Sequence, residues 1–283
     1  MHDTVNARQS ELAYQAERAT KMDGVGPTPD YIIERYRRNR LWRLFPKEFM
    51  FKHLGEMDRK EILDFGCGEG QLSTQLARLG GLVTASDISP ELVDLAKRRA
   101  ILDGVQDRID FIVADVAESL LPKNKFDFVI CHAALHHVDL RSVMPHILAC
   151  LKPGGVAIMV EPIAFSPLLQ RSRDMLPFEK DASPDERQLN QDDVKFILGL
   201  FDESQMAFFN LFGRLARLFP NRNKIDKGHP LTKTALVALA GLDRLLVSAW
   251  PGLSRFCGTI VMVGRKRVGS SGTGNPAASS PGP

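Results

Sequence analysis

The chain has 283 residues, of which 44% are hydrophobic, and this is enough to bury the core of one large domain. Its 37 basic and 34 acidic residues leave a net charge of +3, which gives no support to a nucleic-acid partner. The four cysteines form no C-x-x-C pair and have no histidine at zinc-ligand spacing, so we expect reduced thiols and no metal site. The N-terminus lacks the basic and then apolar pattern of an export signal, which predicts a cytoplasmic protein.

The first part of the chain predicts a helical cap. Residues 1–55 are polar with amphipathic helical pieces, of which PDYIIERYRRNRLWRLF at 29–45 is the clearest. The arginines of this stretch are typical of a solvated helix face, and binding of RNA or of an anionic substrate is the alternative. Tyr14, Tyr31 and Tyr36 are candidates for contacts that a closing lid would make.

The central part of the chain alternates short apolar runs with helical segments. The runs EILDF, LVTASD, IDFIVAD, FDFVICH and GVAIMVEP predict strands, and helices are expected at 71–79, 90–102 and near 140–151. SQMAFFNLF at 204–212 and CGTIVMVGRK at 257–266 predict two more strands around a helical stretch at 213–249. This alternation predicts an α/β fold: a Rossmann-like, mostly parallel sheet with helices on both faces, in which ligands bind at the carboxyl ends of the strands.

The C-terminal part contains one long apolar stretch and a polar end. LTKTALVALAGLDRLLVSAW is interrupted by Lys233, Asp243 and Arg244, short of the roughly 20 apolar residues that a membrane span requires. We expect a packed amphipathic helix, with peripheral membrane contact left open. VGSSGTGNPAASSPGP predicts a disordered tail. The predicted divisions are a cap at 1–55, a ligand-binding core at 56–162, a substrate-side insertion at 163–255, the last strand at 256–267 and the tail at 268–283.

A glycine-rich turn follows the first predicted strand. In ILDFGCGEG at 62–70, glycines that include Gly66 and Gly68 stand between a strand and a helix, where they let a ligand approach the main chain. Asp64 closes the strand and Glu69 stands among the glycines, so a pyrophosphate at the helix N-terminus would be repelled. The pattern therefore favours a ligand without a phosphate.

Further acids follow the next two predicted strands. Asp87 can accept hydrogen bonds from two ribose hydroxyls, and Asp115 can bind the exocyclic amine of an adenine that packs on Ile88 and Val116. The structural alternatives are that Asp64 only orients the glycine turn and that the other two acids cap helices. Three acids at three successive strand ends suit an adenosyl ligand that is cationic overall.

Taken together, these motifs resemble a known family. ILDFGCGEG, VTASDIS, FIVADV, FDFVICHAALHHV and LKPGGVAIMVEP, in this order over residues 58–162, resemble the class I S-adenosylmethionine-dependent methyltransferases, and among them the small-molecule branch of ubiquinone and menaquinone biosynthesis enzymes. The resemblance implies a seven-stranded sheet with an antiparallel last strand, and S-adenosyl-L-methionine as the cofactor. The methionine part would meet the glycine turn, and the sulfonium would lie near 131–133. The residues assigned to the cofactor are Asp64, Gly66, Cys67, Gly68, Asp87, Ile88, Asp115, Val116 and Cys131.

Methyl transfer from a sulfonium is an in-line displacement that needs alignment, exclusion of water and, for a protonated acceptor, a base. No metal is required. His132 and His136 follow the fourth strand, and we assign both as candidates for the base or for orienting the acceptor, with His132 first. Packing or capping is the alternative role for each, and Glu161 at the end of the fifth strand is either a solvent-facing or structural acid or a substrate contact.

The sequence thus predicts an S-adenosylmethionine-dependent methyltransferase acting at oxygen, carbon or nitrogen of a small organic acceptor. The apolar residues of 206–219 and 235–246 could line a site for a lipophilic acceptor or rest on a membrane surface, and ordinary core packing is the alternative. Methylation of a nucleic acid such as RNA is an alternative. It is disfavoured because strand four is not followed by the Asn/Asp-Pro-Pro-aromatic tetrad of amino-group DNA methyltransferases and because no basic stripe runs through the core. A dehydrogenase is disfavoured by Glu69 and by the lack of a Tyr-x-x-x-Lys pair. A non-catalytic adenosyl-binding module is the alternative from outside the enzymes.

Overall fold

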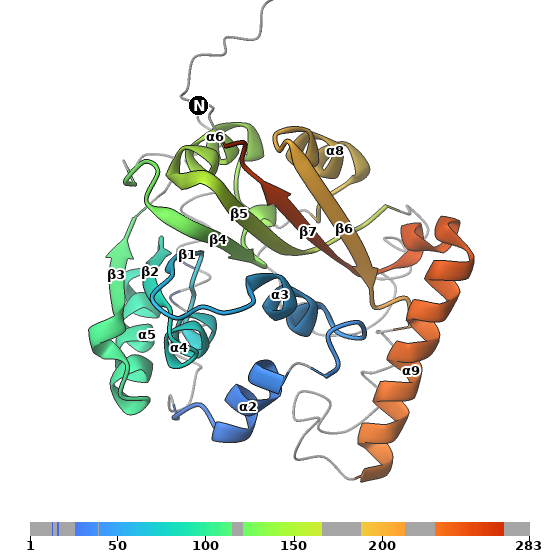
Figure 1. Ribbon diagram of the computed structural model, residues 1–283, viewed down its shortest axis with the longest axis horizontal. Helices are drawn as coiled ribbons and strands as arrows, with labels where there is room; N and C mark the ends of the chain where they lie inside the picture. Colours follow the sequence, from blue (N-terminus) through green and yellow to red (C-terminus); the bar gives the residue numbers. More distant parts are fainter. Residues whose placement is uncertain are drawn as a thin grey trace, which may run out of the picture.

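The computed structural model describes residues 26–38, 40–114, 121–165, 188–212 and 230–268, together with Ala13 and Ala16. These residues form one sheet with helices packed on both of its faces (Figure 1). The α/β class, the sheet and its two helical layers are therefore as the sequence predicted.

The sheet has seven strands in the order β3-β2-β1-β4-β5-β7-β6. The pairs among β1 to β5 are parallel, whereas β7 runs antiparallel to both β5 and β6. The strands are β1 Glu61–Phe65, β2 Leu82–Asp87, β3 Ile109–Val113, β4 Phe126–His132, β5 Leu151–Pro162, β6 Glu203–Phe209 and β7 Thr259–Arg265. Because the chain builds outward from β1 to β3 and then returns to the other side of β1, the strand order reverses between β1 and β4, which is where open α/β sheets bind ligands.

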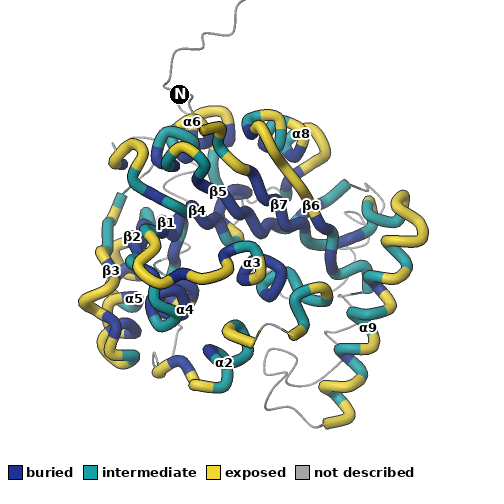
Figure 2. Tube along the Cα trace, viewed as in Figure 1, coloured by how far each residue is buried: buried dark blue, intermediate teal, exposed yellow. Residues whose placement is uncertain are grey.

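Helices cover the sheet in two groups. Residues of α6 (Leu140–Cys150) and α8 (Gln191–Gly199) share a buried core with one face. Residues of α3 (Pro46–Leu54), α4 (Gln71–Arg78) and α5 (Pro90–Leu102) share the core of the other face. Neighbouring residues of β5 point into opposite cores, since strand side chains alternate between faces, and this is why the central strands are buried throughout (Figure 2). The remaining helical elements are α2 Asp30–Arg38, α9 Pro230–Ala249 and the short 3₁₀ turns η1 Gln106–Arg108, η2 Leu135–His137 and η5 Pro251–Phe256.

The long helix α9 lies along the end of the sheet at β6 and leaves much of its surface exposed (Figures 1 and 2). Two of the three charged residues that argued against a membrane span attach the helix to the rest of the structure. The Asp243 carboxylate accepts a hydrogen bond from Phe212 N at 3.1 Å, and Arg244 donates to Phe208 O at 3.0 Å. Within the described part of the chain, no helix is long and apolar enough to cross a membrane.

The expected elements agree with the structure apart from their ends. The sixth strand begins and ends earlier than expected, and the last strand is shorter by a few residues. The expected helix at 213–249 is described only from residue 230, and the predicted tail lies outside the described residues except for Val268. The boundaries proposed for the cap, core and insertion stay predictions.

Packing of Phe201 on β7 gives a stability prediction. A Cβ on Gly264 of β7 would stand 2.3 Å from the nearest ring atom of the buried Phe201. We expect Gly264→Ala to lower the free energy of unfolding by about 1–3 kcal/mol in denaturant titrations, because a tight core must shift to admit the methyl group. Gly199→Ala, where a Cβ meets no atom within 4 Å, is the control and should not destabilise the protein. An equal change in the free energy of unfolding for the two variants would contradict the predicted clash between a methyl group at position 264 and Phe201.

Candidate functional site

The turn between β1 and α4 is built on left-handed backbone positions. Gly66, Gly68 and Gly70 have φ angles of 69°, 54° and 74°. A Cβ at Gly66 would stand 2.6 Å from the Cβ of Ala134, and a Cβ at Gly70 would stand 2.6 Å from that of Ala96. A side chain is therefore excluded at both positions by backbone conformation and by close packing. A Cβ at Gly68, in contrast, would meet no protein atom within 4 Å, so the main chain there borders open space.

Asp87, at the end of β2, is fastened to this turn. Its Oδ2 accepts a hydrogen bond from Gly68 N at 2.8 Å, and its Oδ1 accepts one from Ser89 N at 3.0 Å. Ser89, and not Asp87, is the N-cap of α5, because the Ser89 hydroxyl accepts from Leu92 N. Asp87 thus orients the glycine turn, and a carboxylate has about four acceptor sites in all.

Asp64 and Lys47 bring opposite charges to the buried side of the turn. Asp64 is 1% exposed and accepts a hydrogen bond from Ser73 Oγ at 2.6 Å. Burial raises the pKa of Asp64 to about 6, although Ser73 and the positive charge of Lys47 oppose this. Burial lowers the pKa of Lys47, on α3, to about 8 against the attraction of Asp64 and Glu48. Among the described residues no hydrogen bond or ion pair engages the Lys47 ammonium, whose Nζ lies 5.7 Å from the ring centroid of Tyr36.

Lys47 is the residue of this site that the sequence analysis missed. It comes from the cap, outside the motifs of the core, and its neighbours in sequence are charged and aromatic residues with no recognisable spacing. The structure brings it to the glycine turn because α3 packs on the sheet face that carries α4.

The loop after β4 is held by Glu161. This carboxylate is 0% exposed and its Oε1 accepts hydrogen bonds from Ala134 N at 3.0 Å and Leu135 N at 2.9 Å. Its Oε2 lies 2.7 Å from Nδ1 of His136. Glu161 is therefore a buried structural acid, not a solvent-facing one, and it fixes the loop that packs against Gly66.

The two candidate histidines occupy different electrostatic surroundings. Burial and then the positive charge of Lys47 lower the pKa of His132 to about 4, so this ring is neutral at pH 7. His136 instead faces the Glu161 carboxylate, and its ring centroid lies 4.0 Å from that of His137. In the parts of the chain that the structure covers, no three His, Cys, Asp or Glu side chains are grouped to hold a metal ion.

The structure describes some of the remaining predicted site residues but not all of them. Cys67 and Cys131 are buried, and burial together with nearby carboxylates raises the pKa of both thiols well above the ordinary value, so neither is a nucleophile. Ile88 directly follows Asp87 and is partly buried. Asp115 and Val116 lie outside the described residues. The assignment of all nine residues to a cofactor stays a prediction at this point.

Glu69 corrects one step of the sequence argument. Its carboxylate pairs with Arg99 of α5 at 3.0 Å, and Arg99 Nε also donates to the Glu69 carbonyl at 3.1 Å. This ion pair offsets the charge of Glu69, so Glu69 opposes a phosphate less than the sequence suggested. The argument against phosphate now depends on Asp64 and Asp87, whose mutual repulsion contributes to the raised pKa of Asp64.

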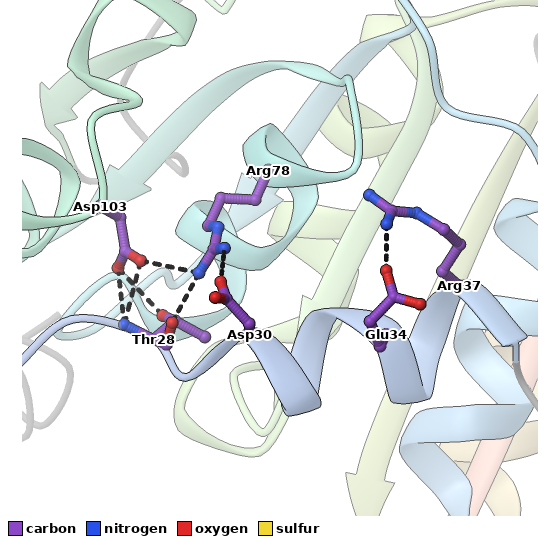
Figure 3. Close-up of polar contacts among 6 residues, drawn as sticks. All are labelled: Thr28, Asp30, Glu34, Arg37, Arg78 and Asp103. Carbon is purple, nitrogen blue, oxygen red and sulfur yellow. Dashed lines mark hydrogen bonds and ion pairs between the residues drawn. The ribbon is translucent and has the colours of Figure 1, made fainter.

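The same arginine connects the glycine turn to the segment that leads into the first turn of α2, which we call the clasp (residues 26–30). Arg99 donates to Gly26 O at 3.3 Å. Figure 3 shows the rest of the attachment: the Asp103 carboxylate accepts hydrogen bonds from N and Oγ1 of Thr28, and Arg78 donates to the Thr28 carbonyl. Arg78 also pairs with Asp103 and Asp30. The clasp and the glycine turn are therefore held by one polar network.

Comparison with known proteins agrees with this geometry. Residues 63–159 match the family model of the methyltransferase domain. A mitochondrial ubiquinone biosynthesis O-methyltransferase of Schizosaccharomyces pombe is 39% identical over 112 residues, which are 39% of this chain and 40% of that protein. The chain thus matches about two fifths of the length of this relative.

Solved structures are similar over more of the chain. Phosphoethanolamine N-methyltransferase 2 of Haemonchus contortus, in complex with phosphomonomethylethanolamine and S-adenosylhomocysteine, has a TM-score of 0.52 at 17% identity and covers 77% of this chain and 51% of its own. The [4+2]-cyclase SpnF also has a TM-score of 0.52, at 19% identity, and covers 83% of this chain and 81% of its own. At these identities the likeness shows the fold, which is that of the class I methyltransferases. The predicted family resemblance and sheet are confirmed.

The raised pKa of Asp64 predicts a pH-dependent stability difference between wild type and Asp64→Asn. Between pH 4 and pH 6 the folded chain binds a proton at Asp64 that the unfolded chain, with an ordinary value of 3.8, releases. Stability relative to Asp64→Asn should therefore rise by about 2 kcal/mol as the pH falls from 7 to 4. The variant is the necessary reference because the lowered pKa of His132 acts in the opposite direction over the same range. Denaturant titrations across this range that give a constant difference would contradict the assignment.

Because Arg99 joins the clasp to the glycine turn, we expect it to support ligand binding without touching the ligand. We expect Arg99→Gln to remain folded and to bind S-adenosylhomocysteine about fivefold to tenfold more weakly in calorimetry, because a charged hydrogen bond at the turn is lost. Arg108→Gln is the control, since Arg108 is exposed and donates one hydrogen bond to Gly80 O. A wild-type affinity in Arg99→Gln would show that the turn keeps its conformation without the clasp.

Proposed function

We propose that the protein transfers the methyl group of S-adenosyl-L-methionine to a small organic acceptor. The observation that carries this proposal is the glycine turn with Asp87 on one side and with Asp64 and Lys47 on the other. Matching sequence over residues 63–159 and the class I fold support it. Since the chain spans only part of its curated relatives, the activity is inferred from the site.

The residues at the turn fit the chemical groups of this cofactor. Asp87 offers carboxylate oxygens to the ribose hydroxyls, and the open side of Gly68 lets the methionine part approach the main chain. Lys47, whose ammonium forms no hydrogen bond or ion pair with the described residues, matches the methionine carboxylate. Asp64 and Asp87 favour the positive charges of the sulfonium and the amine. When bound, the cofactor supplies an electrophilic methyl group on a sulfonium.

We assign the cofactor site to Asp64, Gly66, Cys67, Gly68, Asp87, Ile88 and Cys131, with Lys47 added, and to Asp115 and Val116 on the sequence alone. Cys67 and Cys131 contribute through packing, since both thiols are protonated. The chain itself aligns the two reactants and excludes water, and His132 and His136 are the candidates for contacts with the acceptor. Cytoplasmic location and peripheral membrane contact stay predictions from the sequence.

The acceptor is proposed to be a small molecule, as for the relatives named as ubiquinone biosynthesis O-methyltransferases. The arginines of the cap do not favour RNA, because several are already paired: Arg35 with Glu48, and Arg37 and Arg38 with Glu34. The similarity to a [4+2]-cyclase shows that the fold alone does not establish methyl transfer. The proposal therefore depends on the cofactor site and is tested there.

Calorimetric titration with S-adenosylmethionine, S-adenosylhomocysteine and NADH tests the proposal. We expect both adenosyl ligands to bind and NADH not to bind, because the turn carries acids where a pyrophosphate would lie. Asp87→Ala and Lys47→Gln should each weaken adenosyl binding about tenfold or more, since each removes a charged hydrogen-bonding group. Asp110→Ala, which changes an exposed acid on β3, is the matched control.

Two outcomes would overturn the proposed function. One is failure of both adenosyl ligands to bind the folded wild type. The other is binding that Asp87→Ala and Asp110→Ala weaken to the same extent, because the site would then lie elsewhere in the chain.

A further inference from the structure

We propose that the exposed side of helix α9 binds the surface of a membrane that contains anionic lipids. The residues concerned, which we call the α9 face, are Ala238, Leu242, Leu245 and Ala249 of the helix and Trp250 directly after it. This surface includes none of the residues assigned to the cofactor, and the inference does not depend on the proposed function.

The residues of the α9 face recur with the spacing of a helix. Positions 238, 242, 245 and 249 stand at i, i+4, i+7 and i+11, which places them on one side of the helix. All four are exposed, and Leu245 keeps 66% of its surface accessible. Trp250 is 62% exposed. The helix therefore turns an apolar stripe outward, where a surface helix ordinarily carries polar residues (Figure 2).

The packed side of α9 is defined by other residues. Asp243 is 6% exposed and accepts a hydrogen bond from Phe212 N, so its carboxylate is turned toward the protein. Leu236 is also buried, and Arg244 donates to Phe208 O. These contacts fix the rotation of the helix about its axis. The α9 face is consequently held on the outside by the same contacts that attach the helix.

The charges beside the α9 face suit an anionic surface. Asp243 is the only acid between residues 230 and 268, and it is the residue that is turned inward. Arg255, shortly after the face, is exposed. Burial and then the charge of Arg43 lower the pKa of Arg244, so the exposed Arg43 of the cap brings a further cation near α9. Anionic lipids attract such cations.

This combination favours a bilayer over a second copy of the chain. Helices that bind at a membrane surface carry aliphatic residues and tryptophan on the side that enters the lipid, with lysine or arginine beside them. A symmetric contact between two copies would bring the cations of both copies together. No exposed acid of residues 230–268 would be there to pair with them.

Vesicle binding by the full chain tests the inference. The chain has two tryptophans, so Trp42→Phe leaves Trp250 as the fluorescent reporter. We expect vesicles of phosphatidylcholine mixed with phosphatidylglycerol to shift its emission to shorter wavelength, because lipid removes water from the indole ring. Vesicles of phosphatidylcholine alone should bind more weakly, and added salt should weaken binding to the mixed vesicles. Co-sedimentation of the wild type with the same vesicles checks the result without the Trp42 change.

A double variant tests the α9 face itself. We expect Leu242→Ser with Leu245→Ser to lower the partition coefficient for mixed vesicles about tenfold or more, because two aliphatic side chains no longer enter the lipid. Its melting temperature should stay near that of the wild type, since both side chains are exposed. The matched control is Ile101→Ser with Leu102→Ser on α5, whose side chains are 63% and 52% exposed. This control should bind vesicles as the wild type does.

Four results would overturn the inference. They are a wild type that does not bind mixed vesicles, equal binding to neutral and mixed vesicles, and an equal loss of binding in the two double variants. The fourth is a wild-type dimer in gel filtration that Leu242→Ser with Leu245→Ser converts to a monomer, because the α9 face would then join two copies. Each of these leaves the proposed function intact, since adenosyl binding is measured separately by calorimetry.

Discussion

The site depends on the left-handed turn between β1 and α4. Two of its glycines are in contact with alanines of other elements, Gly66 with Ala134 after β4 and Gly70 with Ala96 in α5. The turn is therefore packed between the loop after β4 and helix α5, at the point where the strand order reverses. No side chain larger than hydrogen can occupy these positions, so the main chain itself forms the wall of the site.

The charges around the turn explain what kind of ligand it suits. Burial opposes the ionised forms of Asp64, Lys47 and His132. It therefore raises the pKa of Asp64 and lowers the pKa values of Lys47 and His132. Such groups are stabilised when a ligand brings complementary charge into the same space. A ligand with a carboxylate, an amine and a sulfonium supplies both signs at short separation, whereas a pyrophosphate supplies only the sign that Asp64 and Asp87 repel.

Much of the fold could be predicted because local sequence signals agree with it. Strand runs, the proline and serine at the start of α5, and the glycines of the turn each act over a few residues. The position of Asp87 near the glycine turn could also be predicted, since a parallel sheet brings the end of β2 beside the end of β1.

The contacts that could not be predicted join distant parts of the chain. Lys47 reaches Asp64 through the packing of α3, Arg99 joins Glu69 to the clasp, and Glu161 meets His136 through the pairing of β4 with β5. These depend on side-chain direction and on the register of packed elements, which a sequence pattern does not specify. The same limit explains why Glu69 looked like an unpaired charge.

A crystal structure of the protein with S-adenosylhomocysteine would test the central claim most directly. The account predicts that the ribose hydroxyls bind the Asp87 carboxylate and that the carboxylate of the homocysteine part lies beside Lys47, with the main chain at Gly68 against the ligand. A ligand bound away from the turn between β1 and α4, or with its adenosine reversed so that the ribose faces Lys47, would contradict it.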